Sequence, residues 1–513
     1  MAFASETCSD LFKAISDTVF ERVRRTAPEG LKGDVSLDTP LDQIGLDSLA
    51  RMEVVNALEE KFKMRFSEDA LYDIVTCRDL VQYVEARLTD KSPPRPSGMS
   101  SMASKRQAAG GADPKHVDVT QFPECAALQQ RLADSMKAGL PNPFFRVKEG
   151  GDGARSIIAG REMVSYTRFD YLGMARHPEV LEAAKQALER FGASASASRL
   201  VGGNQTVHEQ LDQELTDYLG TEAAVAFPSG FGTNASVLGH LFGPDDLVLY
   251  DELAHNSIVQ GTLLSKAQRR PFPHNDFDHL DSLLRDVRDN HRRAVVAIEG
   301  VYSMDGDYPD LPKVIEIKKR HRALLYVDEA HSLGVMGATG RGICEHYGVD
   351  PGEGDIWMGT ISKALGSMGG YIAGRRVLVE YLKYTTPAMV FATAMSPPNA
   401  AAALAAIRVI RREPERVSRL RDRSRLFQKL ARDAGLDIGT SQDTPVIPVI
   451  LRNSARCLHA AAALLVQGID VQPILYPAVP ESASRLRFFL TSEHTEEEIR
   501  RTVQLLTGCL AAI

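Results

Sequence analysis

The sequence predicts a small all-α bundle followed by a larger α/β body that ends in a smaller α+β domain. Three observations predict this division. The formal net charge of −7 over 513 residues lies wholly in residues 1–90, where 18 acidic side chains outnumber 11 basic ones. Residues 91–120 contain 12 Ser, Pro or Gly and no aromatic residue, which is typical of a flexible linker. Beyond them, short apolar runs alternate with helical stretches, as in a mostly parallel sheet.

The first 90 residues show three segments with helical spacing of apolar side chains. They are residues 7–26, a segment that begins near Ser48, and residues 77–88. A long loop with Pro40 separates the first two. We expect a helical bundle that is just large enough to fold alone.

The body, residues 121–513, contains six apolar runs that predict buried strands. They are residues 223–227, 247–251, 294–300, 323–331, 356–360 and 369–374. We place a large domain at about 170–395 and a small domain at 396–513. The small domain is predicted from a helix at 399–412, the segments VIPVIL, VQPILY and RLRFFLT, a helix at 454–467, and a final helix from Thr495. Thr495 and Glu498 fit a capping box.

Composition excludes several classes of protein. At 44% hydrophobic and 25% charged residues the chain is globular, and it has no basic block that predicts nucleic-acid binding. It contains no run of about 18 apolar residues and no signal-peptide pattern at its N-terminus. Its six cysteines form no CxxC, which favours a reducing cytoplasm and predicts no metal site.

Ser48 lies in the segment LDQIGLDSLARMEV, where a loop meets a helix. One interpretation is a simple helix N-cap, worth about 1 kcal/mol. The other follows from its setting, because Ser48 is surrounded by acidic side chains in a 90-residue unit on a linker. This setting resembles an acyl carrier protein, in which the matching serine carries 4′-phosphopantetheine. The resemblance implies a phosphopantetheinyl transferase and an acyl-loading enzyme as partners. A helix N-terminus suits the anionic phosphodiester.

Four clusters in the body place polar groups just after predicted strands. In VDEAHSLG, Asp328 ends an apolar run and His331 follows three residues later. Lys363 lies in the segment GTISKALGSMGG. The segment SGFGTN opens a helix after AAVAF, and His255 follows LVLYD. The carboxyl ends of parallel strands are where α/β sheets bind ligands. The chain has no Walker A motif, so the DEAH string does not indicate a helicase.

Together these clusters resemble the α-oxoamine synthases, fold-type-I enzymes that use pyridoxal 5′-phosphate (PLP). The resemblance spans about residues 140–510 and rests on the order of RFDYLG, SASRLVGGNQTVHEQLDQEL, SGFGTN, DELAHNS, EGVYSMDGD, VDEAHSLGVMGATGRG, GTISKALG and RLRFFLTSEHT. It implies that Lys363 binds the cofactor covalently and later moves the Cα proton. Asp328 would pair with the pyridine nitrogen, His255 would stack on the ring and His331 would bond its phenolic oxygen.

The resemblance also implies the rest of the cofactor pocket. Thr360 and the amides of Gly230 and Phe231 would bind the phosphate. Glu299 and Ser303, from EGVYSMDGD, would line the site.

The substrate contacts follow in the same way. Arg487, the second arginine of RLR, matches the position that holds the amino-acid carboxylate. Phe169 stands where relatives usually have Asn or Ser, so that second substrate contact is not carried over. Fold-type-I enzymes form their sites at a dimer interface, so we expect a homodimer in which Thr393 of VFATAMSPP reaches the partner's phosphate.

The implied reaction joins a small amino acid (Gly, Ala or Ser) to an acyl thioester on the arm of Ser48, with loss of carbon dioxide. The fused carrier indicates specialised biosynthesis. Two alternatives remain at this point: an aminotransferase or decarboxylase acting on a carrier-bound substrate, and a non-catalytic scaffold.

Overall fold

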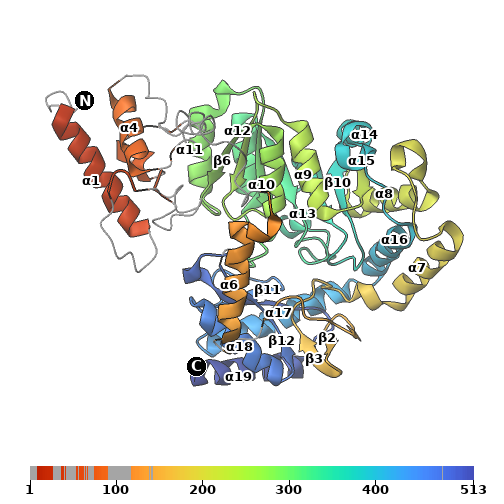
Figure 1. Cartoon of the computed structure of the whole chain (residues 1–513). Coiled ribbons are helices and arrows are strands. Elements are labelled where there is room, and N and C mark those ends of the chain that lie inside the picture. Colours follow the sequence, from red (N-terminus) through yellow and green to blue (C-terminus); the bar gives the residue numbers. More distant parts are fainter. Residues whose placement is uncertain are drawn as a thin grey trace. The chain divides into compact units, whose positions relative to one another are not determined.

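The structure is a computed structural model of the whole chain (Figure 1). It describes residues 8–26, 36–39, 41, 54–55, 57–59, 61–62, 64, 66, 74, 76–89, 117–137, 139, 142–476 and 478–513. Ser48 and residues 91–116 of the predicted linker lie outside the described residues. The chain divides into two compact units, Met1–Gln129 and Gln130–Ile513. This division falls within helix α6 (Pro123–Lys137), beyond the predicted end of the linker at residue 120.

The N-terminal unit is helical, as predicted. Helices α1 (Cys8–Thr26) and α4 (Cys77–Leu88) coincide with two of the predicted helices, and residues 54–55, 57–59 and 61–62 of the third are helical as well. α4 begins with a capping box between Thr76 and Asp79. The apolar faces meet in one core, whose members on these helices include Ile15, Val19, Val23, Val54, Val55, Leu58, Leu80, Val81 and Val84.

The second unit contains a seven-stranded mixed sheet. Across the sheet its strands are β4 (Ala223–Phe227), β10 (Gly370–Gly374), β9 (Ile356–Thr360), β8 (Leu324–Asp328), β7 (Ala294–Glu299), β5 (Leu247–Asp251) and β6 (Gln268–Phe272). β10 is antiparallel to both of its neighbours, and the other pairs are parallel. All six predicted strands are present. β6 was not predicted, because in the sequence QRRPF only Phe272 is fully buried at this edge of the sheet.

Helices cover both faces of this sheet (Figure 1). Alternate strand residues point to opposite faces, so Val296 and Ile298 join one core while Val295 and Ala297 join the other. The first core includes α7 (Pro178–Phe191), α8 (Thr206–Leu219), α11 (Phe277–Val287), α12 (Leu311–His321), α13 (Ile343–Tyr347) and α16 (Pro397–Arg412). The second includes α9 (Gly230–Leu241), α10 (Asn256–Ser265), α14 (Arg376–Thr385) and α15 (Pro387–Val390). Burial on both faces explains why these strands read as continuous apolar runs.

The small domain has two further sheets. One is antiparallel, in the order β11 (Val446–Ile450), β14 (Arg485–Phe489), β13 (Gln472–Ile474). The other has the order β1 (Gly150–Gly151), β2 (Arg155–Ile158), β3 (Arg161–Ser165), β12 (Ile469–Asp470). Helices α17 (Glu415–Asp433), α18 (Ser454–Val466) and α19 (Glu496–Ala512) pack beside them, and the predicted capping box of Thr495 and Glu498 is present. The short strands β1–β3 were not predicted.

The helices that follow the predicted domain boundary at residue 396 pack against different partners. α16 packs against α7 and α8 of the large domain, whereas α17 packs against α19 of the small domain. By these contacts α16 groups with helices of the large domain and α17 with a helix of the small domain, so that Glu413–Pro414 joins two differently packed helices, and the boundary at residue 396 stays a prediction. The alanine-rich face of α16 explains its packing, because small side chains let it approach the large domain closely.

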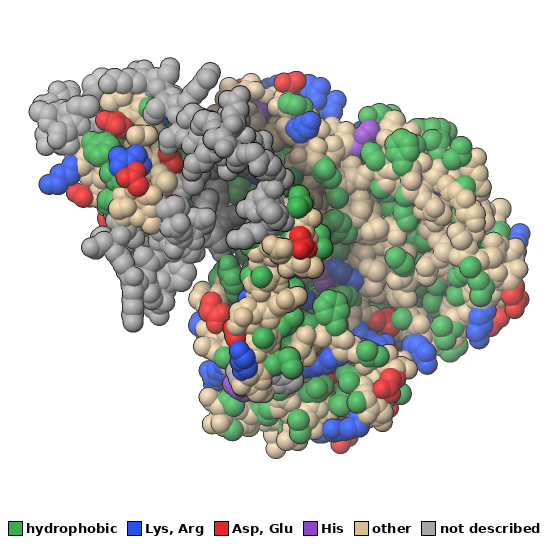
Figure 2. Space-filling model, viewed as in Figure 1, with side chains coloured by type: hydrophobic (Ala, Val, Ile, Leu, Met, Phe, Trp, Pro, Cys, Tyr) green, Lys and Arg blue, Asp and Glu red, His purple; other side chains and the backbone are tan. Residues whose placement is uncertain are grey.

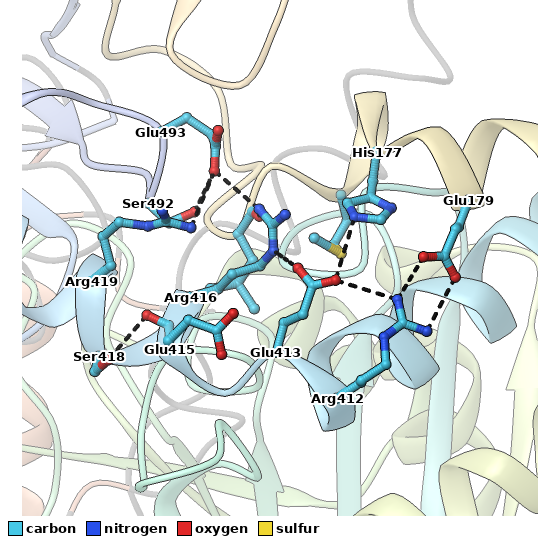
Figure 3. A network of polar contacts seen from close by, with 12 residues as sticks. His177, Glu179, Arg412, Glu413, Glu415, Arg416, Ser418, Arg419, Ser492 and Glu493 are labelled. Carbon is cyan, nitrogen blue, oxygen red and sulfur yellow. Dashed lines mark hydrogen bonds and ion pairs between the residues drawn. The ribbon is translucent and has the colours of Figure 1, made fainter.

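A network of ion pairs ties this junction to its neighbours (Figure 3). Arg412 at the end of α16 pairs with Glu179 on α7 at 2.6 Å. Arg416 on α17 pairs with Glu413 at 2.7 Å and with Glu493, just after β14, at 3.1 Å. The charges of the junction are thus shared among α7, α16, α17 and the chain that leads into α19.

Among the described residues, His177, Glu179 and Glu413 are close enough to offer three ligands to a metal ion. Arg412 bonds both carboxylates, and the imidazole of His177 lies 3.8 Å from Glu413. The guanidinium therefore already neutralises these oxygens. Among all the residues that the structure describes, no helix has the length and hydropathy that crossing a membrane requires.

His274 lies just after β6, in a polar cluster that is linked to the small domain through Asp307. Its Nδ1 lies 2.9 Å from Asp251 at the end of β5, and its Nε2 lies 3.0 Å from Asp307. Thr440 of the small domain also donates to Asp307, at 2.7 Å. Burial opposes a charge on the ring, but the bonds to the two carboxylates outweigh it and raise the pKa of His274 to about 10.

We predict that the stabilising effect of His274 falls as the pH rises. An imidazole with a pKa of about 10 in the folded chain and an ordinary pKa of 6.5 when unfolded stabilises fully below pH 6.5, and this effect is lost towards pH 10. The difference in free energy of unfolding between wild type and His274→Asn should shrink from pH 7 to pH 10, by about 1.4 kcal/mol per pH unit at most. Denaturant unfolding at several pH values measures it. His279→Asn, at an exposed position on α11, is the matched control, and a difference that stays constant or grows contradicts the prediction.

Candidate active site

Five strands direct their carboxyl ends to one edge of the large sheet. β5, β7, β8 and β9 are parallel to one another, and β4 runs in the same direction because two antiparallel pairings through β10 separate it from β9. The loops after these ends carry the predicted residues: Gly230 and Phe231 after β4, His255 after β5, Glu299 and Ser303 at β7, Asp328 and His331 at β8, and Thr360 and Lys363 at β9. The topology therefore brings together residues that are up to 133 positions apart in the sequence.

Lys363 follows β9 in a tight turn that is closed by a bond from Gly366 N to its carbonyl. Burial lowers the pKa of its amine to about 8, although Asp328 and Glu299 favour the charged form. A larger share of the Lys363 amine is thus neutral near pH 7 than in an exposed lysine. The neutral amine is the form that can attack a carbonyl carbon.

Asp328 and Glu299 are neighbouring buried carboxyl groups. Ala330 N–H and the Asn234 amide each donate to Asp328, at 2.9 and 2.7 Å. Glu299 accepts the backbone N–H of His255 at 2.5 Å. Burial and the nearby Asp328 raise the pKa of Glu299 well above its ordinary value, so Glu299 is protonated more readily than an exposed glutamate.

His331 is held by an aromatic cluster. Its Nδ1 lies 2.6 Å from the hydroxyl of Tyr171, and its ring is nearly parallel to that of Phe489 at 6.2 Å. Burial lowers the pKa of His331 well below its ordinary value, and the cations Lys363 and Arg487 act in the same direction. The ring is therefore neutral, and Nε2 is the nitrogen left for a ligand. Sequence reasoning missed Tyr171, although it lies in the RFDYLG string.

The loop after β4 forms a narrow cradle at the start of α9. Ser229 caps the helix by accepting Gly232 N–H at 3.1 Å. A Cβ on Gly230 would lie 2.6 Å from Thr360 Oγ1, so only glycine lets the loop approach Thr360 this closely. Backbone N–H groups at a helix start beside a threonine hydroxyl form a phosphate-binding arrangement.

Arg487 lies on β14 of the small domain and faces the site. It donates to the carbonyl of Ser303 at 3.0 Å and contacts Met304 Sδ, also at 3.0 Å. Its Nε is buried without a hydrogen-bond partner, and no carboxylate among the described residues forms an ion pair with it. Arg485, on the same strand, pairs with Asp305 at 2.6 Å. Arg487 thus has an unused guanidinium edge, which is suited to a carboxylate ligand.

Two positions, Phe169 and Thr393, differ from the other residues discussed for the site. Phe169 packs edge-on against Phe489 at 4.7 Å, and its ring centre lies 5.8 Å from Lys363 Nζ. Phe169 therefore supplies an apolar wall at the position where relatives usually have the polar side chain of Asn or Ser. Thr393 is exposed, and no hydrogen bond joins its side chain to the other site residues within the described part of this chain. Its role toward a partner subunit stays a prediction.

The residues of this site fit PLP. The cradle at Gly230 suits its phosphate, the buried carboxylate of Asp328 suits a protonated pyridine nitrogen, and the Lys363 amine suits its aldehyde. The fold and the site together define a PLP-dependent transferase of fold type I.

Comparisons with known proteins agree with this class. Residues 163–506 match the family "Aminotransferase class I and II", and residues 22–84 match "Phosphopantetheine attachment site". The chain is 39% identical to the 8-amino-7-oxononanoate synthase of Symbiobacterium thermophilum, over 72% of this chain and 94% of that protein. It is 36% identical to the one of Thermoanaerobacter pseudethanolicus, over 72% and 93%.

Solved structures give the same result. The serine palmitoyltransferase of Sphingomonas wittichii aligns with a TM-score of 0.73 and 30% identity, over 77% of this chain and 98% of that one. A further serine palmitoyltransferase structure, with PLP bound, aligns equally well over 99% of its chain. This chain belongs to the α-oxoamine synthase family, and an acyl-carrier domain precedes its synthase domain. It is a PLP-dependent acyltransferase whose cofactors are PLP and covalent 4′-phosphopantetheine, and the family reaction is decarboxylative condensation of an amino acid with an acyl thioester.

We predict that Gly230→Ala weakens PLP binding about tenfold or more, because the added methyl group would enter the cradle beside Thr360. The dissociation constant, measured by titrating the PLP-free full chain, tests this. Gly243→Ala is the matched control, since a Cβ there meets nothing within 4 Å. Unchanged binding in Gly230→Ala would show that the phosphate lies elsewhere.

Proposed function

We propose that this enzyme condenses a small amino acid (glycine, alanine or serine) with an acyl group that its own carrier domain holds on Ser48. A bond forms between the amino-acid Cα and the acyl carbon, and the thioester C–S bond breaks to release the thiol of the arm. The bond from Cα to the carboxylate also breaks, so that one proton is taken up and the products are an α-aminoketone and carbon dioxide. The observation that carries the proposal is the presence of a phosphopantetheine attachment domain and a synthase domain in one chain.

The residues of the site divide this work. Lys363 would hold the cofactor and move the proton at Cα, and its lowered pKa supports both roles. When bound, PLP supplies an electron sink for the carbanion at Cα. Asp328 would keep the pyridine nitrogen of PLP protonated. His255 would position the pyridine ring from its face, and His331 would position it from its edge. Neutral histidines suit this task because they add no charge beside the protonated ring.

Arg487 would anchor the substrate carboxylate. Its buried, unpartnered Nε and its place beside Ser303 support this assignment. The aromatic wall of Phe169 offers no hydrogen bond to the substrate, so the carboxylate depends on the guanidinium.

We predict that Arg487→Ala raises the KM for the amino acid about ten- to a hundredfold, the range for loss of a hydrogen bond to a charged group. The dissociation constant for PLP should stay within about twofold, because Arg487 lies on the small domain and not in the phosphate cradle. Steady-state kinetics and PLP titration separate these effects. Arg452→Ala, which loses a surface ion pair with Asp437, is the control. An unchanged KM contradicts the carboxylate role.

The carrier gives the acyl group a high local concentration. Roughly 30 residues of linker let a tethered arm reach millimolar effective concentration at a partner site. A phosphopantetheinyl transferase must attach the arm and a loading enzyme must supply the acyl group, and we place this work in specialised biosynthesis in the cytoplasm.

We infer that the enzyme works as a homodimer. Exposed apolar side chains on and beside α14 and α15 support this, and hydrophobic side chains gather there in the upper right of Figure 2. They are Val377, Tyr381, Tyr384 and Phe391. A second copy would bury them and could bring its Thr393 to the phosphate of this chain.

We predict that Ser48→Ala abolishes turnover of carrier-bound acyl groups while PLP binding stays unchanged. Intact-protein mass spectrometry of the phosphopantetheinylated full chain, offered acyl groups and amino acids, follows arm loading and product release together. Ser36→Ala, an exposed serine of the same unit, is the control. Undiminished turnover in Ser48→Ala would refute the carrier role, and carbon dioxide release without an acyl group would favour a decarboxylase.

A further inference from the structure

Asn234 lies at the centre of a buried hydrogen-bond network beneath the active site. It lies on α9, and its side chain faces β8 and the start of α10. Its Oδ1 is 2.6 Å from the hydroxyl of Tyr326, and its Nδ2 is 2.7 Å from Asp328 Oδ2 and 2.8 Å from Ser257 Oγ. Asn234, Ser257 and Tyr326 are each no more than 1% exposed. One amide thus uses its acceptor and both donor hydrogens in a site closed to water.

The orientation of this amide is determined by its neighbours. In the reverse orientation the amide oxygen would face the Asp328 carboxylate at 2.7 Å, acceptor against acceptor, in a buried site. The Tyr326 hydroxyl adds a second constraint, because it donates to the oxygen in the orientation described. Asn234 Nδ2 therefore donates to both Asp328 and Ser257.

The direction of the hydrogen bonds continues to His255. Ser257 Oγ accepts from Asn234, so its own proton points to His255 Nδ1 at 2.7 Å. The backbone N–H of Ser257 also points to Nδ1, at 3.2 Å. A nitrogen that accepts twice carries no proton, so His255 is neutral with its hydrogen on Nε2.

The charged groups around His255 do not reverse this result. Burial lowers the pKa of His255, and Lys363 and Arg487 lower it further, while Asp328 acts in the opposite direction. Glu299 bonds the backbone N–H of His255 and not its ring.

Close packing holds α9 and α10 in register for this network. A Cβ on Gly261 of α10 would lie 2.7 Å from the carbonyl oxygen of Asn234, and a Cβ on Gly239 of α9 would lie 2.9 Å from Leu264. Glycine at both positions lets the two helices touch along their backbones, so Asn234 and Ser257 have little freedom to separate.

We propose that Asn234 is a positioning residue that orients the Asp328 carboxylate through one hydrogen bond and sets the tautomer of His255 through Ser257. We call these the Asp328 arm and the His255 arm. Tyr326 orients the amide for both arms. The proposal deepens the proposed function and rests on its assignment of Asp328 and His255 to the cofactor.

Three variants of the full-length enzyme separate the arms. Ser257→Ala removes only the His255 arm, Asn234→Leu removes both arms with a side chain of similar size, and Tyr326→Phe frees the amide to turn. Tyr371→Phe is the matched control, because the Tyr371 hydroxyl is also buried but has no hydrogen-bond partner among the residues that the structure describes. The readouts are the pKa of His255, from NMR titration of histidine-labelled protein without PLP, and the dissociation constant for PLP. A His255→Gln variant assigns the resonance.

We expect Ser257→Ala to raise the pKa of His255 by about one unit, because donors to Nδ1 favour the neutral ring. It should weaken PLP binding by less than Asn234→Leu does, because the Asp328 arm stays intact. Asn234→Leu should raise the same pKa and weaken PLP binding about tenfold. Tyr326→Phe should move both readouts in the same directions by less, and Tyr371→Phe should move neither.

Two results would overturn the proposal: wild-type values of both readouts in Asn234→Leu, or a loss of PLP affinity in Ser257→Ala as large as in Asn234→Leu. If Asn234→Leu does not fold, Ser257→Ala and Tyr326→Phe decide. Wild-type values of both readouts in both variants then count against the proposal. A wild-type chain that does not bind PLP contradicts the cofactor assignment instead, since the titration of His255 requires no cofactor.

Discussion

The catalytic body depends on keeping the carboxyl group of Asp328 buried at the end of a central strand of the α/β sheet. An ionised side chain at the end of a buried strand costs several kcal/mol unless its oxygens are bonded. Ala330 and Asn234 bond both oxygens, and Lys363 supplies a cation nearby. The surroundings follow from this requirement: glycine lets α9 and α10 approach, buried tyrosines line the strands, and neutral histidines lie beside the charge. The same low dielectric that makes the carboxylate costly makes it effective toward a bound cation.

The site combines groups whose environments move their pKa values in useful directions. Burial makes Lys363 a better nucleophile and lowers the pKa of His255 and His331, while Arg487, whose Nε is buried, forms no ion pair with a carboxylate of the described residues. A buried Nε without a hydrogen-bond partner is unfavourable in the free protein, and a substrate carboxylate bound to Arg487 would relieve that cost. In the proposed function the large domain thus holds the cofactor, and the small domain, through Arg487 on β14, binds the amino acid.

Much of this could be predicted from the sequence, for identifiable reasons. The six central strands are buried on both faces and therefore appear as uninterrupted apolar runs, and the capping box at Thr495 is a local pattern. β6 and β1–β3 could not be predicted in this way, because edge strands and short strands carry polar residues that periodicity does not detect. The packing of α16 against α7 and α8 could not be predicted either, since it is a tertiary property. Tyr171 and Asn234 lie in motifs that were noted, RFDYLG and SGFGTN, but nothing in a motif says which neighbour its side chain meets.

The sequence by itself determined the two-part organisation, the uneven charge and the family, and it predicted a set of residues for the chemistry. These are properties of composition, residue order and local pattern, so they can be read without knowing the fold. Only the tertiary structure decided how those residues act on one another. It placed Arg487 beside Ser303, left its Nε unpartnered, and directed the proton of Ser257 to His255. The physical reason is that a hydrogen bond has a direction and a buried charge has a cost, and both depend on which atoms the folded sheet and its helices bring within about 3 Å.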